Sequence, residues 1–246
     1  FSNFQGPPTP VGSGEVYGMV GSPISHVLGY GGSGSLSYSI VGLPPGLILN
    51  VDTGEITGTP VVAGDTQVTV TVSGQNVAGA PMNDTRIYEI KISDPSAFPF
   101  KMDLTLSGYD GNSTLSDFPV LIDLHPGLTN FSYSTFLSPT GSDLRFFASS
   151  GQELPYEVEI WNPAGHSRLW VKCPSVDGIN TLITAAWGNA AETTAPSYLL
   201  DGSAWSNDFS GAWHFSDLVA NKFVDASPLL NHAANSGATV DAAGQI

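Results

Sequence analysis

Three closely spaced turn sequences followed by a strand-like segment constrain the fold of the first part of this chain. Residues 43–60 read LPPGLILNVDTGEITGTP and contain a Pro-Pro-Gly corner, an Asp-Thr-Gly turn and a Gly-Thr-Pro corner. Residues 67–72, QVTVTV, alternate apolar and hydroxyl side chains without interruption. Pro, Gly and Asp favour specific turn conformations, and a period of two is typical of a half-buried strand. Short strands joined by fixed turns indicate a small β-sandwich.

This run resembles the immunoglobulin-like, cadherin-like modules that are strung along large bacterial exported proteins. The resemblance rests on the GLPPGL, TG, I, GTP, AG and V-x-V elements between Gly42 and Val72. It implies a module type and does not imply a ligand. We expect residues 1–14, rich in Gly and Pro, to form a linker or extended arm, and residues 15–94 to form an immunoglobulin-like sandwich. Its inner faces are predicted from alternation to carry Leu36, Tyr38, Ile40, Val68, Val70, Val72, Tyr88, Ile90 and Ile92.

A second set of alternating segments predicts another antiparallel sandwich over residues 99–200. In residues 154–160, every second side chain is apolar, which places Glu157, Glu159 and Trp161 on the opposite face. The turn at residues 162–167 leads back into Leu169, Val171 and Cys173. Pairing apolar face with apolar face needs a register with odd residue sums, and one such register sets Glu159 opposite Lys172 and Trp161 opposite Trp170. We therefore predict these four residues on the outward face of the hairpin and Ile160, Val171 and Cys173 on the inward face.

The second region is similar to a bacterial domain of unknown function that occurs in large secreted and surface proteins. The similarity rests on three segments, which read LSDFPVLIDL (115–124), GSDLRFFASSGQELPYEVEIWNPAGHSRLWVKCPSV (141–176) and WGNAAE (187–192). No reaction is established for that family. The resemblance therefore implies no catalytic residue.

The remaining residues, 205–246, resemble the opening of a concanavalin-like or laminin-G-like jelly roll. The resemblance rests on GAWHF (211–215) and DASPLLNH (225–232). A partial jelly roll exposes unpaired strand edges and cannot bury its own core. We expect it to be completed by further sequence, by another chain or by packing on the second domain, and we predict an assembly role for Trp213, His214 and Phe215. The predicted fold class is thus all-β, with tandem β-sandwiches and a partial jelly-roll segment.

The composition narrows the classes of partner. Seven Lys and Arg against 22 Asp and Glu give a net charge of −15, which disfavours binding to the phosphate backbone of nucleic acids. No apolar run approaches the roughly 18 residues that a membrane span needs. The single cysteine, Cys173, cannot form an internal disulfide and alternates with apolar neighbours, which favours a buried thiol. The chain starts at Phe1 without an initiator Met or signal peptide, so we expect a piece of a longer exported polypeptide.

Few residues suggest a chemical site. Glu157 and Glu159 lie on one strand face, as paired acid and base groups would, but a solvated surface beside Lys172 is the interpretation we favour. The five histidines show no short ligand spacing and no G-x-S-x-G motif is present, so we predict no catalytic residue, no metal and no cofactor. Outward indoles stack on sugar rings, which makes Trp161 and Trp170, with Glu159 and Lys172, a candidate ligand-binding set.

These observations predict a non-enzymatic segment of a large extracellular or cell-surface bacterial protein, with a role in adhesion or assembly. Its partner would be protein, either self or a neighbouring subunit, or an extracellular glycan. One alternative is an accessory carbohydrate-binding region of a polysaccharide-degrading enzyme. Another is a subunit of an extracellular fibre or surface layer.

Overall fold

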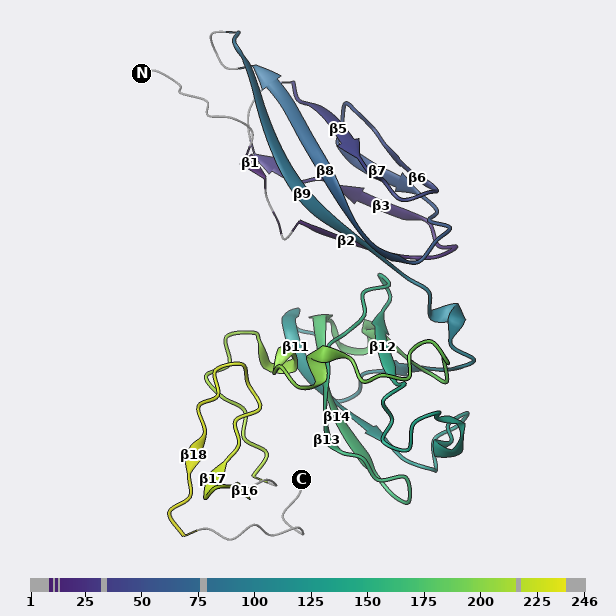
Figure 1. Ribbon diagram of the computed structural model, residues 1–246, viewed down its shortest axis with the longest axis vertical. Helices are drawn as coiled ribbons and strands as arrows, with labels where there is room; N and C mark the ends of the chain where they lie inside the picture. Colours follow the sequence, from purple (N-terminus) through teal and green to yellow (C-terminus); the bar gives the residue numbers. More distant parts are fainter. Residues whose placement is uncertain are drawn as a thin grey trace. The chain divides into compact units, whose positions relative to one another are not determined.

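The computed structural model describes residues 9–10, 12, 14–31, 35–75, 79–215 and 218–237 (Figure 1). Most of the predicted arm at residues 1–14, and the end of the chain from residue 238, lie outside these described residues. The chain is all-β, with 44% of residues in strands and 7% in helical turns, which confirms the predicted fold class. It divides into two compact units, Phe1–Ser96 with Ser150–Gln152, and Ala97–Ser149 with Glu153–Ile246.

The first unit is a sandwich of two main sheets. Its larger sheet has the order β2-β9-β8-β5, formed by Glu15–Met19, Pro81–Ser93, Gly64–Gln75 and Ser37–Val41. The facing sheet has the order β3-β7-β6, formed by Ile24–Val27, Glu55–Gly58 and Leu47–Leu49. A short pair joins β1 (Thr9–Pro10) to β4 (Tyr30–Gly31). Strand β2 runs parallel to β9, whereas the other neighbours are antiparallel.

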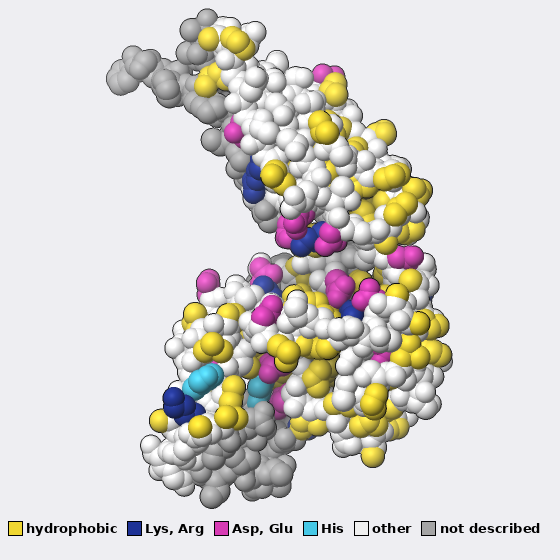
Figure 2. Space-filling view, viewed as in Figure 1, with side chains coloured by type: hydrophobic (Ala, Val, Ile, Leu, Met, Phe, Trp, Pro, Cys, Tyr) yellow, Lys and Arg dark blue, Asp and Glu magenta, His cyan; other side chains and the backbone are white. Residues whose placement is uncertain are grey.

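The core of this unit follows the predicted alternation. Val68, Val70 and Val72 of β8 are at most 1% exposed, and their Thr neighbours point to the opposite face. Of the other predicted inner residues, Tyr38, Tyr88, Ile90 and Ile92 are buried, while Leu36 and Ile40 are partly buried against the same cluster. On the face of this unit that Figure 2 shows, most of the surface is white or yellow and charged side chains are few.

The Pro-Pro-Gly and Gly-Thr-Pro corners lie directly against each other. Gly46 has a φ of +92°, and a Cβ on it would lie 2.1 Å from the carbonyl oxygen of Thr59. Gly58 has a φ of +128°, and a Cβ there would lie 2.2 Å from the carbonyl oxygen of Gly46. The Thr59 amide donates to that same carbonyl at 3.0 Å. Both glycines are therefore required by close approach as well as by conformation.

The second unit contains two three-stranded sheets that enclose its core. One has the order β10-β15-β12, formed by Phe100–Thr105, Leu182–Trp187 and Arg145–Ala148. The other has the order β11-β14-β13, formed by Leu115–Leu124, Ser167–Val176 and Tyr156–Ile160. Single 3-10 turns lie at η2 (Tyr133–Thr135), η3 (Gly178–Asn180), η4 (Ser197–Leu199) and η5 (Ser203–Trp205), while η1 (Pro95–Ala97) spans the division between the two units. A small sheet of the two-residue strands β16 (Leu218–Val219), β17 (Lys222–Phe223) and β18 (Ala233–Ala234) comes next in the chain.

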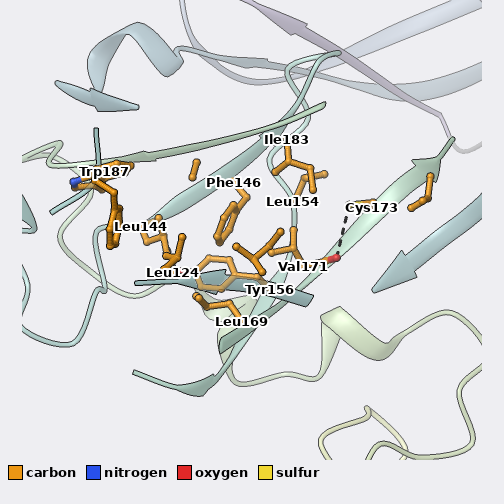
Figure 3. Close-up of a cluster of buried hydrophobic side chains, with 14 residues drawn as sticks. Leu124, Leu144, Phe146, Leu154, Tyr156, Leu169, Val171, Cys173, Ile183 and Trp187 are labelled. Atoms are coloured by element: carbon orange, nitrogen blue, oxygen red, sulfur yellow. Dashed lines mark hydrogen bonds between the residues drawn. The ribbon is translucent and has the colours of Figure 1, made fainter. Parts of the chain in front are cut away.

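The inward faces of these two sheets form one apolar cluster (Figure 3). Leu169 and Val171 are fully buried and Cys173 is 1% exposed, as predicted for the inward face of β14. The buried Tyr156 hydroxyl donates to the Leu144 carbonyl oxygen at 2.9 Å, so its polar atom is satisfied. No helix in the described part of the chain has the length and hydrophobicity of a membrane span.

Asp143 organises the loops at one end of this sandwich. Its fully buried carboxylate accepts hydrogen bonds from the amides of Leu137 (2.9 Å), Ser138 (3.0 Å) and Gly188 (3.0 Å). The neighbouring Arg145, 3% exposed, donates to the carbonyl oxygen of Thr194 at 3.0 Å and to the side chain of Glu192 at 2.9 Å. These two residues connect chain segments that are far apart in sequence, so their role is structural.

Candidate functional site

The hairpin of β13 and β14 differs from the predicted register and contains a β-bulge after Val158. Val158 pairs with Leu169 and Ile160 pairs with Arg168, so Glu159 is an extra residue on β13. Before the bulge, Glu157 lies opposite Trp170, and not Glu159 opposite Lys172 as predicted. Trp170 pairs with Glu157 and not with Trp161, so the predicted register was wrong already before the bulge. The bulge in addition reverses the faces of the residues that follow it.

The bulge turns Ile160 outward and Trp161 toward the core, which is the reverse of the prediction for both residues. Trp161 packs edge-on against Tyr133 (ring centroids 5.3 Å apart) and Phe136 (5.1 Å). Its indole N–H donates to the Pro139 carbonyl oxygen at 2.9 Å. A Cβ on Gly141 would lie 2.4 Å from this indole, so the ring lies directly over that glycine. Trp161 is thus separated from the other predicted ligand-binding residues.

The outer face of β13 and β14 is covered by a segment that we call the strap, residues 203–214. Trp205 of the strap is 7% exposed and packs on Trp170 with ring centroids 5.2 Å apart. Its indole N–H donates to Oε2 of Glu157, and the Trp170 indole N–H donates to Oε2 of Glu159 at 2.7 Å. Glu157 is predicted from the sequence to be solvated, but its side chain is only 23% exposed because the strap covers it.

His214, at the far end of the strap, meets both carboxylates. Its Nε2 lies 3.2 Å from Oε2 of Glu157, and its Nδ1 lies 3.7 Å from Oε2 of Glu159. The imidazole is stacked near Trp170, with ring centroids 6.2 Å apart and an interplanar angle of 25°. It is tilted against Trp205 at 5.6 Å. The fold thus brings together residues that the sequence patterns assign to two separate sites.

Two further hydrogen bonds fix the strap to the same sheet. The Lys172 ammonium donates to Oγ of Ser206 at 2.9 Å and lies 3.6 Å from Oδ1 of Asp117. The predicted pairing of Lys172 with Glu159 is replaced by these contacts. The Asn207 side-chain amide donates to the Ser116 carbonyl oxygen of β11 at 2.9 Å. The strap therefore contacts all three strands of the sheet.

Trp213 and Phe215, the two other residues with a predicted assembly role, contact a different part of the second unit. The indole N–H of Trp213 donates to the Asn231 carbonyl oxygen at 3.0 Å. Phe215 is 59% exposed and packs edge-on against Phe223 of β17 at 5.2 Å. Both side chains thus contact residues 223–231, which come after the strap.

Asp225 ties the strap to that later region. Its carboxylate, in a residue 1% exposed, accepts from the amides of Ala212 (2.7 Å), Ser227 (2.9 Å) and Asn231 (2.7 Å). Burial by itself would raise the pKa of Asp225, but hydrogen bonds from Ala212, Ser227 and Asn231 outweigh it and hold the pKa below its usual value. A charged Asp225 is thus a structural part of the DASPLLNH loop.

The arrangement is a docking site for the strap. Both glutamate carboxylates face donors of the protein itself, two indoles and one imidazole. Within the residues that the structure describes, no three His, Cys, Asp or Glu side chains are grouped to hold a metal ion. Burial raises the pKa of the Cys173 thiol to about 12, so this cysteine is not an activated nucleophile.

Sequence reasoning missed Trp205 and Ser206 as parts of this site. Neither lies in a segment with strand alternation, so no pattern assigns them to a face. The signal present in the sequence is the density of aromatic residues in 205–215, where Trp205, Phe209 and Trp213 occur at regular spacing.

Two family models match parts of the chain. Residues 7–93 match the family described as "Putative Ig domain", and residues 140–216 match the "Domain of unknown function (DUF2341)". The first unit therefore contains an immunoglobulin-like module, and the second match extends through the whole strap. No curated protein is similar in sequence to this chain.

Several solved structures are similar to parts of the chain. Two are described as a putative alpha-galactosidase and a putative alpha-galactosidase/melibiase, both from Bacteroides fragilis. The first is 24% identical, with a TM-score of 0.32, over 38% of this chain and 19% of that one. The second is 26% identical, with a TM-score of 0.32, over 37% and 18%. The human desmocollin-1 ectodomain is 12% identical, with a TM-score of 0.31, over 77% and 40%. This chain spans less than half of each of these structures, and a likeness at these TM-scores assigns no function to it.

Proposed function

We propose that the chain is a non-catalytic structural and interaction segment of a large extracellular or cell-surface protein. In this proposal, the immunoglobulin-like module is a spacer, and the second module clamps the strap and so fixes the position of the residues after it. The observation that carries the proposal is the docking of Trp205 against Trp170 and Glu157. A fixed connection of this kind suits a chain of modules that is displayed on a surface or held under tension.

The extent of the second family match supports the clamp. That match covers residues 140–216, so the strap lies in the same family region as β13 and β14, two of the three strands that it contacts. The sequence patterns instead predict a boundary between a second domain at residues 99–200 and a concanavalin-like segment from residue 205. We propose that the strap belongs to the second module, and that any jelly roll begins after it.

The exposed apolar groups after the strap support a protein partner. Phe215, Val219, Leu229 and Leu230 are each about 60% exposed or slightly more, and they come from the small sheet β16-β17-β18 and its loops. Exposed apolar side chains beside short strands are typical of contacts with other protein surfaces. We propose that this region, including Trp213 and Phe215, contacts a neighbouring subunit or another part of the same large protein.

A glycan platform on the hairpin has less support. Sugar stacking needs exposed indole faces, but Trp161 packs on Tyr133 and Trp170 is covered by Trp205. The accessory carbohydrate-binding role predicted for Trp161, Trp170, Glu159 and Lys172 would therefore lose Trp161, and for Trp170 it would require the strap to leave the sheet.

Truncation tests the clamp. Removing all residues after Ser203 takes away Trp205 and His214 and uncovers Glu157, Glu159 and Trp170. We expect the second module to unfold at a lower denaturant concentration while the immunoglobulin-like module is unaffected. Equal stability of the second module in both chains would contradict the clamp. Light scattering on the same pair tests the protein contact, because an unchanged oligomeric state would rule out an assembly role for the region after residue 203.

A turnover assay tests the non-catalytic part of the proposal. The full chain should cleave no chromogenic glycoside, ester or peptide substrate. Turnover that disappears in Glu157→Gln, with the fold intact by circular dichroism, would show that the glutamate pair is catalytic and would refute the proposal.

A further inference from the structure

Both nitrogens of the His214 ring face a carboxylate oxygen. The contacts measure 3.2 Å to Glu157 and 3.7 Å to Glu159, and the three side chains are 16%, 23% and 13% exposed. A neutral imidazole carries one N–H and one lone pair, whereas the charged ring carries two N–H groups. In the neutral form, one nitrogen would therefore direct its lone pair at a carboxylate oxygen. The docked geometry favours the charged ring.

The aromatic rings next to His214 also favour its charged form, and the nearby lysine contacts other groups. From β14, the Trp170 ring packs against the imidazole, and from η5 the Trp205 ring does so as well. Aromatic faces attract cations. On the same face of β14, Trp170 is flanked by Arg168 and Lys172, and the Lys172 ammonium is directed at Asp117 and Ser206. Asp217 lies outside the described residues.

We propose that the strap is a proton-controlled latch, closed when His214 is charged and loosened when His214 is neutral. The inference rests on the docked strap of the proposed function and adds what regulates it. Opening would uncover the indoles of Trp170 and Trp205 and the carboxylates of Glu157 and Glu159. The latch would thus control access to the aromatic and acidic surface of the second module.

Whether docking of the strap strengthens or weakens with rising pH depends on which strap, docked or undocked, binds the His214 proton more tightly. In this proposal the two carboxylates beside the ring outweigh the burial that opposes its charge, so the docked strap binds the proton more tightly than the undocked strap does. The resulting stabilisation is fully present below the pH at which a free histidine titrates, about 6.5, and is lost as the pH rises above it through the value of the docked state. For one proton, the docking equilibrium changes by up to about tenfold per pH unit.

Hydrogen exchange on the full chain, corrected for intrinsic rates, tests the latch between about pH 5.5 and 8.5, a range in which free carboxylic acids stay ionised. The reporters are the indole N–H of Trp205, which donates to Glu157 of the sheet, and the indole N–H of Trp170, which Trp205 covers. We expect their protection to fall with rising pH by up to about tenfold per unit in the range where His214 titrates. His214→Gln keeps a donor but cannot become charged, so its strap protection should not change with pH.

His166→Gln is the matched control. His166 also contacts a carboxylate, Asp123 at 2.9 Å, but it is 60% exposed and does not contact the strap. This variant should keep the full pH response of the strap. A second measurement tracks the His214 ring by NMR: Glu159→Gln should lower the pH at which the ring titrates. This readout does not depend on whether His214→Gln folds well.

The outcomes separate the latch from the clamp. Protection that is high and constant across this pH range would overturn the latch and leave the clamp intact. An equal pH response in His214→Gln and the native chain would also overturn the latch, because another group would then be the switch. A strap without protection at any pH would overturn both the latch and the proposed clamp.

Discussion

The indole N–H of Trp170 donates to the Glu159 carboxylate at 2.7 Å, across two strands of one hairpin. The alternation predicts both residues on the outer face of this hairpin, but that face is not open to solvent. Trp205 and His214 of the strap lie over it, and Trp205 supplies a second indole N–H to Glu157. The acidic outer face of the sheet is therefore an internal surface of the second module.

Replacing Trp205 should destabilise the second module. The side chain is 7% exposed, and Trp205→Ala removes its packing on Trp170 and its hydrogen bond to Glu157. We expect a loss of about 3 kcal/mol in the free energy of unfolding of this module, measured by denaturant titration. Leu200→Ala is the control, because Leu200 is 93% exposed and its loss should cost less than about 0.5 kcal/mol. Equal effects of the two variants would show that Trp205 is not packed.

Replacing Asp143 should be among the most damaging single changes in the chain. Asp143→Ala leaves the amides of Leu137, Ser138 and Gly188 without their acceptor in a buried site. Each such group costs about 1–3 kcal/mol, so we expect the free energy of unfolding of the second module to fall by about 4 kcal/mol or more. Asp110→Ala, at an exposed turn, should cost less than about 1 kcal/mol. A loss below about 1 kcal/mol for Asp143→Ala would contradict the role assigned to it.

Local patterns predicted the strands and their faces but not the contacts between distant segments. Alternation correctly placed Val70, Leu169 and Cys173 inside, because a strand with one buried face must repeat with a period of two. Alternation assigned the wrong faces to the residues after Val158, because a single bulged residue cannot be recognised in the hydrophobic pattern. It also could not locate Trp205, whose position depends on long-range packing and not on a local period.

In the immunoglobulin-like module, two glycines with positive φ should differ sharply in their tolerance of alanine. Gly46→Ala would place a Cβ 2.1 Å from the Thr59 carbonyl oxygen, whereas Gly21 has a φ of +77° and a Cβ on it would meet nothing within 4 Å. Gly21→Ala should cost about 1 kcal/mol from backbone conformation alone. We expect Gly46→Ala to lower the free energy of unfolding of this module by at least about 2 kcal/mol more than Gly21→Ala does. Similar losses would mean that the two corners are not in contact.

Cys173 should resist thiol reagents in the folded protein. Burial raises the pKa of its thiol to about 12, so the thiol remains protonated at any pH near 8, where an exposed cysteine, with a pKa of about 8.5, is partly ionised. We expect alkylation in native buffer to be slow and to become fast in denaturant. The measurement is the rate of mass increase on labelling. Rapid native labelling would place Cys173 at the surface, against the inward face assigned to it.

A double-mutant cycle between Trp170 and Trp205 tests the docking of the strap on its own chain most directly. The free energy of unfolding of the second module is measured for the native chain, Trp170→Ala, Trp205→Ala and the double variant, at two protein concentrations. We predict a coupling energy of about 1 kcal/mol or more that does not depend on concentration, because the two indoles pack within one chain. Additive effects, within about 0.5 kcal/mol, would show that the indoles do not interact and would contradict the account.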